Sequence, residues 1–250
     1  MFKRIATFTI TAVTSLSFIL GGGQVKAQEV QSTPEVIETY NIDANGNQIQ
    51  IDKIDMGGVE IYGVKTELEN EKEYDAAVEV VDDYINELEE TTPSIETFTA
   101  FTECKTPSVG VGTDGNAKSF NNATSCHERI PGIIQAKYRT SVKKGGWIEG
   151  RWYGTKIPSS IKIGVTYQFT GIDVAPSLSY PLGIGFQKVN NKTVTWYSEP
   201  VTGYWYLRTA HQEISATSSA LGLITGINIT TEAEIYSGGR IYRPKSTVKH

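Results

Sequence analysis

The stretch SATSSALGLITGINITTEAEI, residues 215–235, decides which kind of β-structure this chain forms. It carries no charged residue before Glu232, and from Leu221 onward its larger apolar residues fall mostly on odd positions. A strand with one face on a core and the other in water alternates in this way, and so does a β-hairpin that crosses a membrane. We expect a core strand, with a membrane hairpin that turns near Gly222 or Gly226 as the alternative.

Neighbouring segments repeat this alternation and are separated by turn-forming residues. In SSIKIGVTYQFTGI, residues 159–172, the odd positions from Ile161 to Phe169 are apolar and the even positions between them are mostly polar. By contrast, the Gly- and Asn-rich residues 108–125 are typical of turns. About eight or nine strands are expected in residues 97–250, which indicates a single β-sandwich or barrel.

Residues 28–96 differ from this β-rich part in charge. They contain 19 Asp and Glu against 3 Lys, a net charge of −16. Residues 97–250 contain 17 Lys and Arg against 9 Asp and Glu, a net charge of +8. Asymmetry of this kind suggests an interaction segment or a charge-matched partner. The sequence therefore favours two parts, an acidic segment and a basic β-rich domain.

The acidic segment is expected to contain a hairpin, a further strand and one amphipathic helix. The hairpin turn is predicted at Asn45-Gly46, and the further strand within residues 56–68. The helix is predicted at about residues 70–90, with Asn70 as its cap. Its apolar face consists of Tyr74, Ala77, Val78, Val81, Tyr84, Ile85 and Leu88. The whole chain is thus expected to be mainly β, with a β-sandwich or barrel preceded by a small acidic α+β segment.

Residues 1–27 have the features of a signal peptide. Lys3 and Arg4 precede an apolar run from Ile5 to Leu20, and small residues up to Ala27 follow three glycines. The run is short for a membrane-spanning helix, so we favour cleavage after Ala27 over a membrane anchor. The mature chain is expected to be secreted to the extracellular side.

Cys104 and Cys126 are the two cysteines of the chain. In an exported protein an even number of cysteines usually pairs, so we expect one disulfide bond rather than two free thiols. Two cysteines and three scattered histidines match no zinc-site spacing, and no phosphate-binding or dinucleotide-binding loop is present. No metal and no cofactor is therefore predicted.

Aromatic and basic residues gather in the β-rich part, and we take them as surface candidates for ligand binding. Exposed rings beside cations stack on sugars or lie at a membrane interface, although strand alternation would bury about half of them. The candidates are Trp147, Arg151, Trp152, Tyr204, Trp205 and Arg208. We expect a secreted, non-enzymatic protein whose basic β-domain binds an anionic cell-envelope polymer or lipid headgroups. Nucleic acid is not expected as a partner, because no basic stripe or nucleic-acid-binding motif is present.

The charge asymmetry also suggests that residues 28–96 are a pro-segment. Such a segment would be held on the basic domain by its charge and its high effective concentration, until a protease cuts between Glu90 and Thr102. The first alternative function follows from this: a pore-forming toxin or bacteriocin released from an acidic pro-segment, with residues 215–235 in the membrane. The opposing interpretation is a stable acidic subdomain that keeps the protein soluble.

A secreted hydrolase is the second alternative. Glu149 lies between Trp147 and Trp152, which suits a sugar site that needs a carboxyl group of raised pKa. Glu213 follows His211 by two positions, and residues i and i+2 share one face of a strand. No nucleophile motif accompanies them. No catalytic residue is therefore assigned, and an enzyme is the less favoured interpretation.

Overall fold

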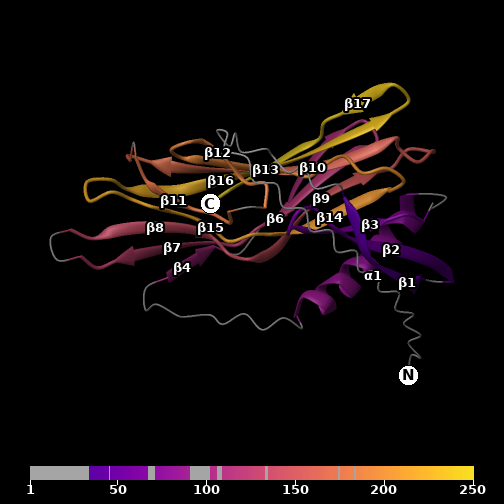
Figure 1. The fold of residues 1–250 in the computed structure, drawn as a ribbon, viewed down its shortest axis with the longest axis horizontal. Helices are drawn as coiled ribbons and strands as arrows, with labels where there is room; N and C mark the ends of the chain where they lie inside the picture. Colours follow the sequence, from indigo (N-terminus) through magenta and orange to yellow (C-terminus); the bar gives the residue numbers. More distant parts are fainter. Residues whose placement is uncertain are drawn as a thin grey trace, which may run out of the picture. The chain divides into compact units, whose positions relative to one another are not determined.

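Antiparallel β-sheets make up most of the described chain, as the alternating apolar patterns predict (Figure 1). The computed structural model describes residues 34–44, 46–66, 71–90, 102–105, 109–132, 135–173, 175–182 and 184–250. The predicted signal peptide and most of the predicted cleavage region lie outside these residues. Within the described ranges, no helix combines the length and the apolar character that a membrane span requires.

The strands form three sheets. Sheet A has the order β1 (Glu35–Ala44), β2 (Asn47–Asp55), β3 (Glu60–Val64), β14 (Tyr206–His211), β9 (Gly145–Trp152), β6 (Ala117–Asn122) and β5 (Gly110–Asp114). Sheet B has the order β11 (Ser177–Ser179), β15 (Ile214–Thr217), β8 (Lys137–Val142), β7 (Ser125–Ile130) and β4 (Thr102–Lys105). Sheet C has the order β12 (Gln187–Asn190), β13 (Thr193–Tyr197), β10 (Ser160–Gly171), β16 (Ile224–Ser237) and β17 (Arg240–Tyr242), and β18 (Lys245–Lys249) also pairs with β16.

Sheets A and B are built from successive parts of the same long strands. β6 and β7, β8 and β9, and β14 and β15 each follow one another after a break of two residues. The strand order is the same on both sides of the breaks, β14–β9–β6 in sheet A and β15–β8–β7 in sheet B. Two of the breaks touch, since the Lys143 amide donates a hydrogen bond of 2.9 Å to the Thr124 carbonyl. Three strands therefore bend together where sheet A passes into sheet B.

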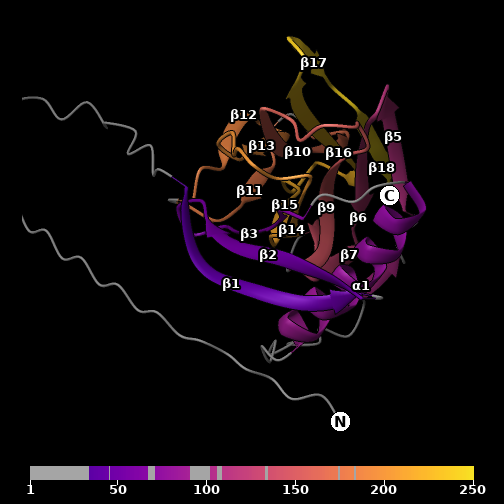
Figure 2. The same cartoon turned by 90° about the vertical axis from the view of Figure 1, so that its right-hand side faces the viewer.

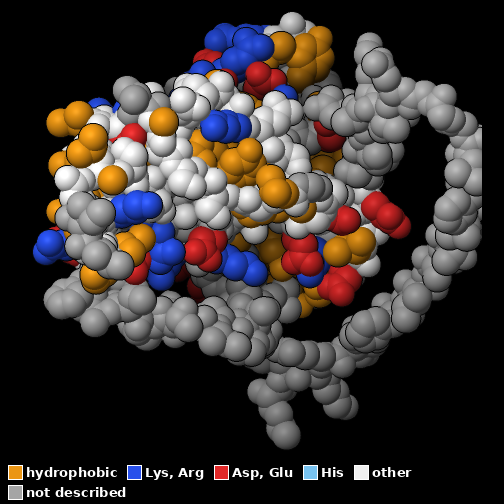
Figure 3. All heavy atoms as spheres, turned by 60° about the vertical axis from the view of Figure 1, so that its left-hand side comes forward, with side chains coloured by type: hydrophobic (Ala, Val, Ile, Leu, Met, Phe, Trp, Pro, Cys, Tyr) orange, Lys and Arg blue, Asp and Glu red, His pale blue; other side chains and the backbone are white. Residues whose placement is uncertain are grey.

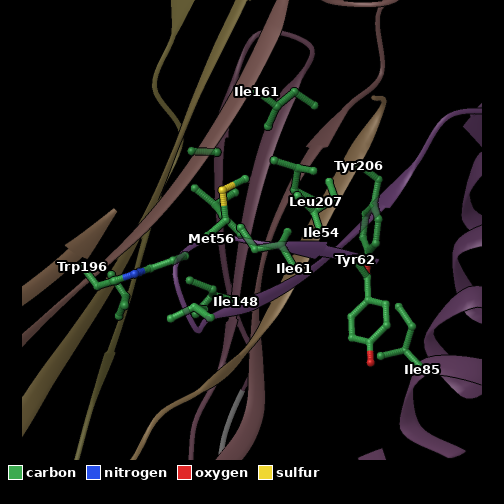
Figure 4. Close-up of a cluster of buried hydrophobic side chains, with 14 of the residues drawn as sticks. Ile54, Met56, Ile61, Tyr62, Ile85, Ile148, Ile161, Trp196, Tyr206 and Leu207 are labelled. Carbon is green, nitrogen blue, oxygen red and sulfur yellow. The ribbon is translucent and has the colours of Figure 1, made fainter. Parts of the chain in front are cut away.

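Sheet C packs on sheet A and forms the main core with it. β16 lies against β6 and β9, and the odd residues of β10 from Ile161 to Phe169 are buried as predicted. Figure 4 shows Ile148 and Leu207 of sheet A in one cluster with Ile161 and Trp196 of sheet C. This arrangement is sandwich-like, so the predicted mainly β fold is confirmed.

The stretch at residues 215–235 contributes to two different sheets. Residues 215–217 belong to β15 of sheet B, whereas β16, which begins at Ile224, lies inside sheet C. Ile227 and Ile229 are buried, as expected for a core strand. The two halves therefore do not form a hairpin with one another in this fold.

The strands of the acidic segment form as predicted and join sheet A. β1 and β2 make the expected hairpin, with Gly46 at φ +90°, and β3 pairs with β2. On its other side β3 pairs with β14, where Tyr62 lies opposite Arg208. Residues 28–96 and 97–250 thus share one sheet, and removal of the acidic segment stays a prediction.

The predicted helix is α1 (Glu71–Glu90), which lies beside the strands of the acidic segment (Figure 2). Ile85 of this helix packs beside Tyr62 of β3 (Figure 4). The apolar face is confirmed for Ala77, Val78, Val81 and Ile85, which are buried, and for Tyr84, which is partly buried. The side chains of Tyr74 and Leu88, and the predicted cap Asn70, lie outside the description.

The prediction that residues 108–125 are mostly turn is wrong. They form β5 and β6, joined by a turn at Gly115 with φ +56°. The glycines of β5 allow close packing, because a Cβ atom at Gly112 would lie 1.9 Å from the Lys245 carbonyl oxygen in β18. The predicted strand number is also too low, since fifteen strands, many of them short, lie in the described part of residues 97–250.

A Gly112→Ala variant is expected to lower the free energy of unfolding by about 1–3 kcal/mol, because the backbone of β18 must shift to admit the methyl group. Urea unfolding measures this difference. Val111→Ala serves as the control, since this neighbouring side chain is exposed, and we expect a change within about 0.5 kcal/mol. Equal stability of Gly112→Ala and the unmodified protein would refute the close-packing role of this glycine.

The predicted disulfide is confirmed. Cys104 of β4 and Cys126 of β7 lie opposite one another in sheet B and are bonded. The bond closes a loop with a sequence separation of 22 residues, which stabilises the fold by roughly 3 kcal/mol in the chain-entropy treatment. It ties the edge strand β4 to the rest of sheet B.

Candidate functional site

A layer of charged side chains lies between α1 and sheet A. Alternation along β9 places Trp147, Glu149 and Arg151 on one face of the sheet, and alternation along β14 does the same for Tyr206 and Arg208. The antiparallel register sets Glu149 opposite Arg208 and Arg151 opposite Tyr206. Glu149 and Arg208 are only 1% and 0% exposed. This group of residues, with Asp82 of α1, is named the arginine cluster.

Asp82 of α1 is the carboxylate that joins the helix to both arginines. Its Oδ1 lies 2.9 Å from Arg208 Nη1, and its Oδ2 lies 3.4 Å from Arg151 Nη2. Asn86 accepts a hydrogen bond of 2.7 Å from Arg208 Nη2. Residues four apart lie on the same side of a helix, so one side of α1 supplies both contacts.

Glu149 is the second carboxylate of the arginine cluster. It accepts a hydrogen bond of 2.8 Å from Arg151 Nε, and its Oε1 lies 3.7 Å from Arg208 Nη1. Burial raises the pKa of Glu149 to about 7; Arg151 and Arg208 oppose this shift, and the negative charge of Asp82 adds to it. The cluster therefore contains a carboxyl group that takes up a proton near neutral pH.

Tyr206 lies between the two carboxylates. Its hydroxyl oxygen is 2.7 Å from Asp82 Oδ1 and 3.0 Å from Glu149 Oε1. A hydroxyl has one proton to donate, so it serves one of these oxygens at a time. A proton on Glu149 would supply the second hydrogen bond, which agrees with the raised pKa of that carboxyl group.

Aromatic rings lie against both arginines. The guanidinium carbon of Arg151 is 4.1 Å from the ring centre of Phe120, and that of Arg208 is 5.3 Å from the ring of Trp147. Both distances permit cation–π attraction. The rings therefore help to fix the two guanidinium groups on the sheet.

An open cleft of about 400 Å³ lies between α1 and the part of β9 that carries Trp147 and Arg151. Its lining consists of Asp75, Val78, Glu79, Asp82, Asp83, Asn86, Trp147 and Arg151. Six of these eight residues come from the helix, and four of the six are acidic. Even so, the described residues include no group of His, Cys, Asp and Glu that would hold a metal ion.

A second polar cluster joins the acidic strands to the basic part. Asp52 of β2 is buried, accepts a hydrogen bond of 2.8 Å from the Tyr204 hydroxyl and forms an ion pair with Lys65. Burial alone would raise the pKa of Asp52, but hydrogen bonds from Lys65, Gln50 and Tyr204 lower it below its ordinary value. The Tyr153 hydroxyl also donates a hydrogen bond of 3.0 Å to Asp75 of α1, so the carboxylates of Asp52, Asp75 and Asp82 each join residues 28–96 to residues 97–250.

The six candidate ligand-binding residues do not form an exposed surface in this structure. Trp147, Arg151 and Arg208 come together in the arginine cluster, Tyr204 lies in the Asp52 cluster, and Trp152 and Trp205 lie in the hydrophobic core. The expected exposure is wrong for every candidate except the half-buried Trp147. Strand alternation and the covering helix are the physical reasons. The role of these residues in ligand binding stays a prediction.

Asp82, Asn86 and Tyr206 belong to the site, although they were not among the candidate residues predicted from the sequence. Asp82 and Asn86 directly follow Val81 and Ile85, two buried residues of the helix. Polar residues that border an apolar helix face lie at the edge of the contact with the sheet. This position is the feature of the sequence from which Asp82 and Asn86 could have been predicted as site residues.

His211 does not pair with Glu213. β14 ends at His211, and Glu213 is exposed. The ring of His211 instead lies in the core, with Nδ1 2.8 Å from the Tyr167 hydroxyl and Nε2 3.1 Å from Asn121 Oδ1. Burial, with a smaller contribution from His250, lowers the pKa of His211 to about 3. A neutral ring that accepts from Tyr167 and donates to Asn121 has no free nitrogen for a substrate.

Several exposed basic side chains lie beside acidic ones. Ion pairs join Arg139 to Glu128, Arg240 to Asp114, Arg243 to Glu234 and Lys245 to Glu232. Figure 3 shows basic and acidic side chains intermixed on one face of the molecule. On that face the positive charge is therefore not gathered into one cationic surface.

Comparisons with known proteins leave the function to be argued from the site itself. No family model, no curated protein and no solved structure matches this chain.

Proposed function

We propose that this protein is a secreted binder of anionic surfaces whose arginine cluster is covered by α1 until the helix is displaced. The observation that carries the proposal is the position of Asp82. This one carboxylate, supplied by the acidic segment, lies against Arg151 and Arg208 of the basic part. A carboxylate or phosphate group of a ligand offers the same charge and similar acceptor oxygens to a guanidinium group. Asp82 thus makes the contacts with the arginines that we propose a ligand anion would make.

The chemistry of the site favours an anionic envelope polymer or lipid headgroups. Removal of Asp82 leaves Glu149 in contact with Arg151 and Arg208, so these three described groups carry a surplus positive charge. Trp147 adds a flat ring that packs on a sugar or lies at a lipid interface. These features support an anionic ligand with repeated charges rather than a neutral one.

Displacement of α1 requires an external event. The helix buries Val78, Val81 and Ile85, and each such side chain contributes roughly 1.5–3 kcal/mol. Cleavage between Glu90 and Thr102 would free one end of the helix, while β3 stays paired with β14. The proposal therefore needs displacement of the helix and not removal of the whole acidic segment.

Engineered protease sites on both sides of α1, within residues 67–70 and 91–101, test the proposal. Cutting at both sites releases the helix and leaves β1–β3 in place. We expect binding to phosphatidylglycerol vesicles or to immobilised heparin to become about tenfold tighter, which corresponds to about 1.4 kcal/mol. The gain should shrink as salt screens the charges. The two materials separate headgroup binding from polymer binding, and the uncut chain is the reference.

Two arginine pairs provide matched variants for this experiment. In the cut chain, Arg151→Gln with Arg208→Gln is expected to abolish the gain, whereas Arg240→Gln with Arg243→Gln is expected to preserve it. Asp82→Asn with Asn86→Ala in the uncut chain should give a smaller gain without any cleavage. If the cut chain and this uncut variant both bind as the unmodified uncut chain does, the proposal is refuted.

A further inference from the structure

Two loops at one end of sheet C expose large apolar side chains. Ile172 directly follows β10 and is 82% exposed, and Leu221 precedes β16 and is 87% exposed. Leu223, in the same loop as Leu221, is 37% exposed. Single exposed apolar residues need no explanation, but neighbouring ones point to an interaction site. These side chains therefore indicate an interaction site only if the two loops are neighbours.

The two loops are in direct contact. The amide of Ile172 donates a hydrogen bond of 2.8 Å to the carbonyl of Leu223. A Cβ atom at Gly222 would lie 2.3 Å from a carboxylate oxygen of Asp173, so the glycine permits this close approach. Ile172, Leu221 and Leu223 therefore belong to one surface, which is named the loop patch.

Asp173 holds the base of the loop patch. Its carboxylate accepts hydrogen bonds from the backbone amides of Ser219 and, at 3.0 Å, Ala175. These bonds, above all the one from Ser219, keep the pKa of Asp173 below its ordinary value. Turning the loops inward would break these bonds to a buried charge. The apolar side chains are thus fixed in an exposed position.

A basic residue borders the loop patch. Lys192, in the turn between β12 and β13, donates a hydrogen bond of 2.9 Å to the carbonyl of Gly171. Apolar side chains beside a lysine suit an anionic lipid interface, where the apolar groups enter the acyl region and the ammonium group meets a phosphate.

We propose that the loop patch inserts into the interface of an anionic lipid membrane. This contact is separate from the arginine cluster, since the loop patch belongs to sheet C and needs no displacement of α1. The protein with α1 still in place over the arginine cluster would therefore attach to a membrane first and expose Arg151 and Arg208 there. A stable protein interface commonly buries roughly 1,200–2,000 Å², which three side chains on two loops do not supply.

Vesicle binding by the intact, uncut protein tests the proposal. Flotation with vesicles of phosphatidylcholine and phosphatidylglycerol is expected to recover the protein. The variant Ile172→Ser, Leu221→Ser, Leu223→Ser is expected to lose at least about tenfold in partitioning. The matched control is Ile157→Ser with Ile241→Ser, which changes two other exposed isoleucines and is expected to bind as the unmodified protein does. Thermal unfolding checks that all proteins are folded.

A tryptophan probe locates the contact independently of affinity. Leu221→Trp is expected to give additional fluorescence that brominated lipids quench, whereas Ile241→Trp is not. No vesicle binding by the intact protein, normal binding by the serine variant, or an unquenched Leu221→Trp signal would overturn the proposal. Loss of self-association in the serine variant without vesicle binding would also overturn it, in favour of a second copy of the chain. The proposed function of the arginine cluster is tested separately, by the change in binding when α1 is released.

Discussion

An Arg208→Met variant is expected to lose about 3–5 kcal/mol of the free energy of unfolding. Arg208 is fully buried, with Nη1 2.9 Å from Asp82 and 3.7 Å from Glu149. Methionine fills much of the same volume but leaves both carboxylates to share Arg151. A buried charge without its partner is strongly unfavourable because water cannot reach it. Urea unfolding followed by circular dichroism measures the loss.

Two further variants separate the loss of charge from the loss of packing. Glu149→Gln in the Arg208→Met background leaves one carboxylate for Arg151, so we expect it to restore about half of the lost stability. Arg240→Met removes an exposed arginine paired with Asp114 and should change stability by less than about 1 kcal/mol. If Arg208→Met behaves like Arg240→Met, the buried charges do not hold α1 on the sheet.

Local patterns predicted the helix, the first hairpin and several strands, but they missed β5 and β6 and did not show how the strands group into sheets. The hairpin at Gly46, the helix α1 and the alternation of β10 each depend on neighbouring residues only. The pairing of β3 with β14 depends instead on register between distant parts of the chain, which no local pattern specifies. The glycines of β5 misled the prediction, because a glycine needed for close packing looks like a turn glycine in sequence.

The candidate site was predictable only in part, for a related reason. The aromatic and basic residues around Trp147, Arg151 and Arg208 stand out in the sequence, and alternation places those of each strand on one face. Nothing in the sequence shows that α1 lies over them. The position of Asp82 beside the apolar helix face indicates contact with the sheet, but it does not show that Asp82 contacts both arginines.

Glu149→Gln is expected to remove a pH dependence of stability between about pH 4.5 and 7. Burial raises the pKa of Glu149 from its ordinary value of 4.5 to about 7, so the folded state binds this proton more tightly than the unfolded state does. The stabilisation by the proton is complete below the ordinary value and is lost as the pH rises through about 7. The change amounts to about 3 kcal/mol, measured as the difference in unfolding free energy between the protein and the variant.

The comparison with the variant is necessary because other groups act in the opposite direction. Burial lowers the pKa of His127, His211 and His250, so these residues lose stabilisation as the pH falls below their ordinary value of 6.5. Their contributions are the same in both proteins and cancel in the difference. Parallel stability curves for the two proteins would show that Glu149 does not take up a proton in this range.

Asp82 should link this proton to the position of α1. Its negative charge helps to raise the pKa of Glu149, so Asp82→Asn is expected to move the transition to lower pH. The coupling is reciprocal. When Glu149 is protonated and neutral, Asp82 is the charged partner of both arginines, so the ion pairs between α1 and the sheet become stronger. The amides of α1 should therefore have higher hydrogen-exchange protection factors at pH 6 than at pH 8. Equal protection at both pH values would mean that protonation of Glu149 and docking of the helix are independent.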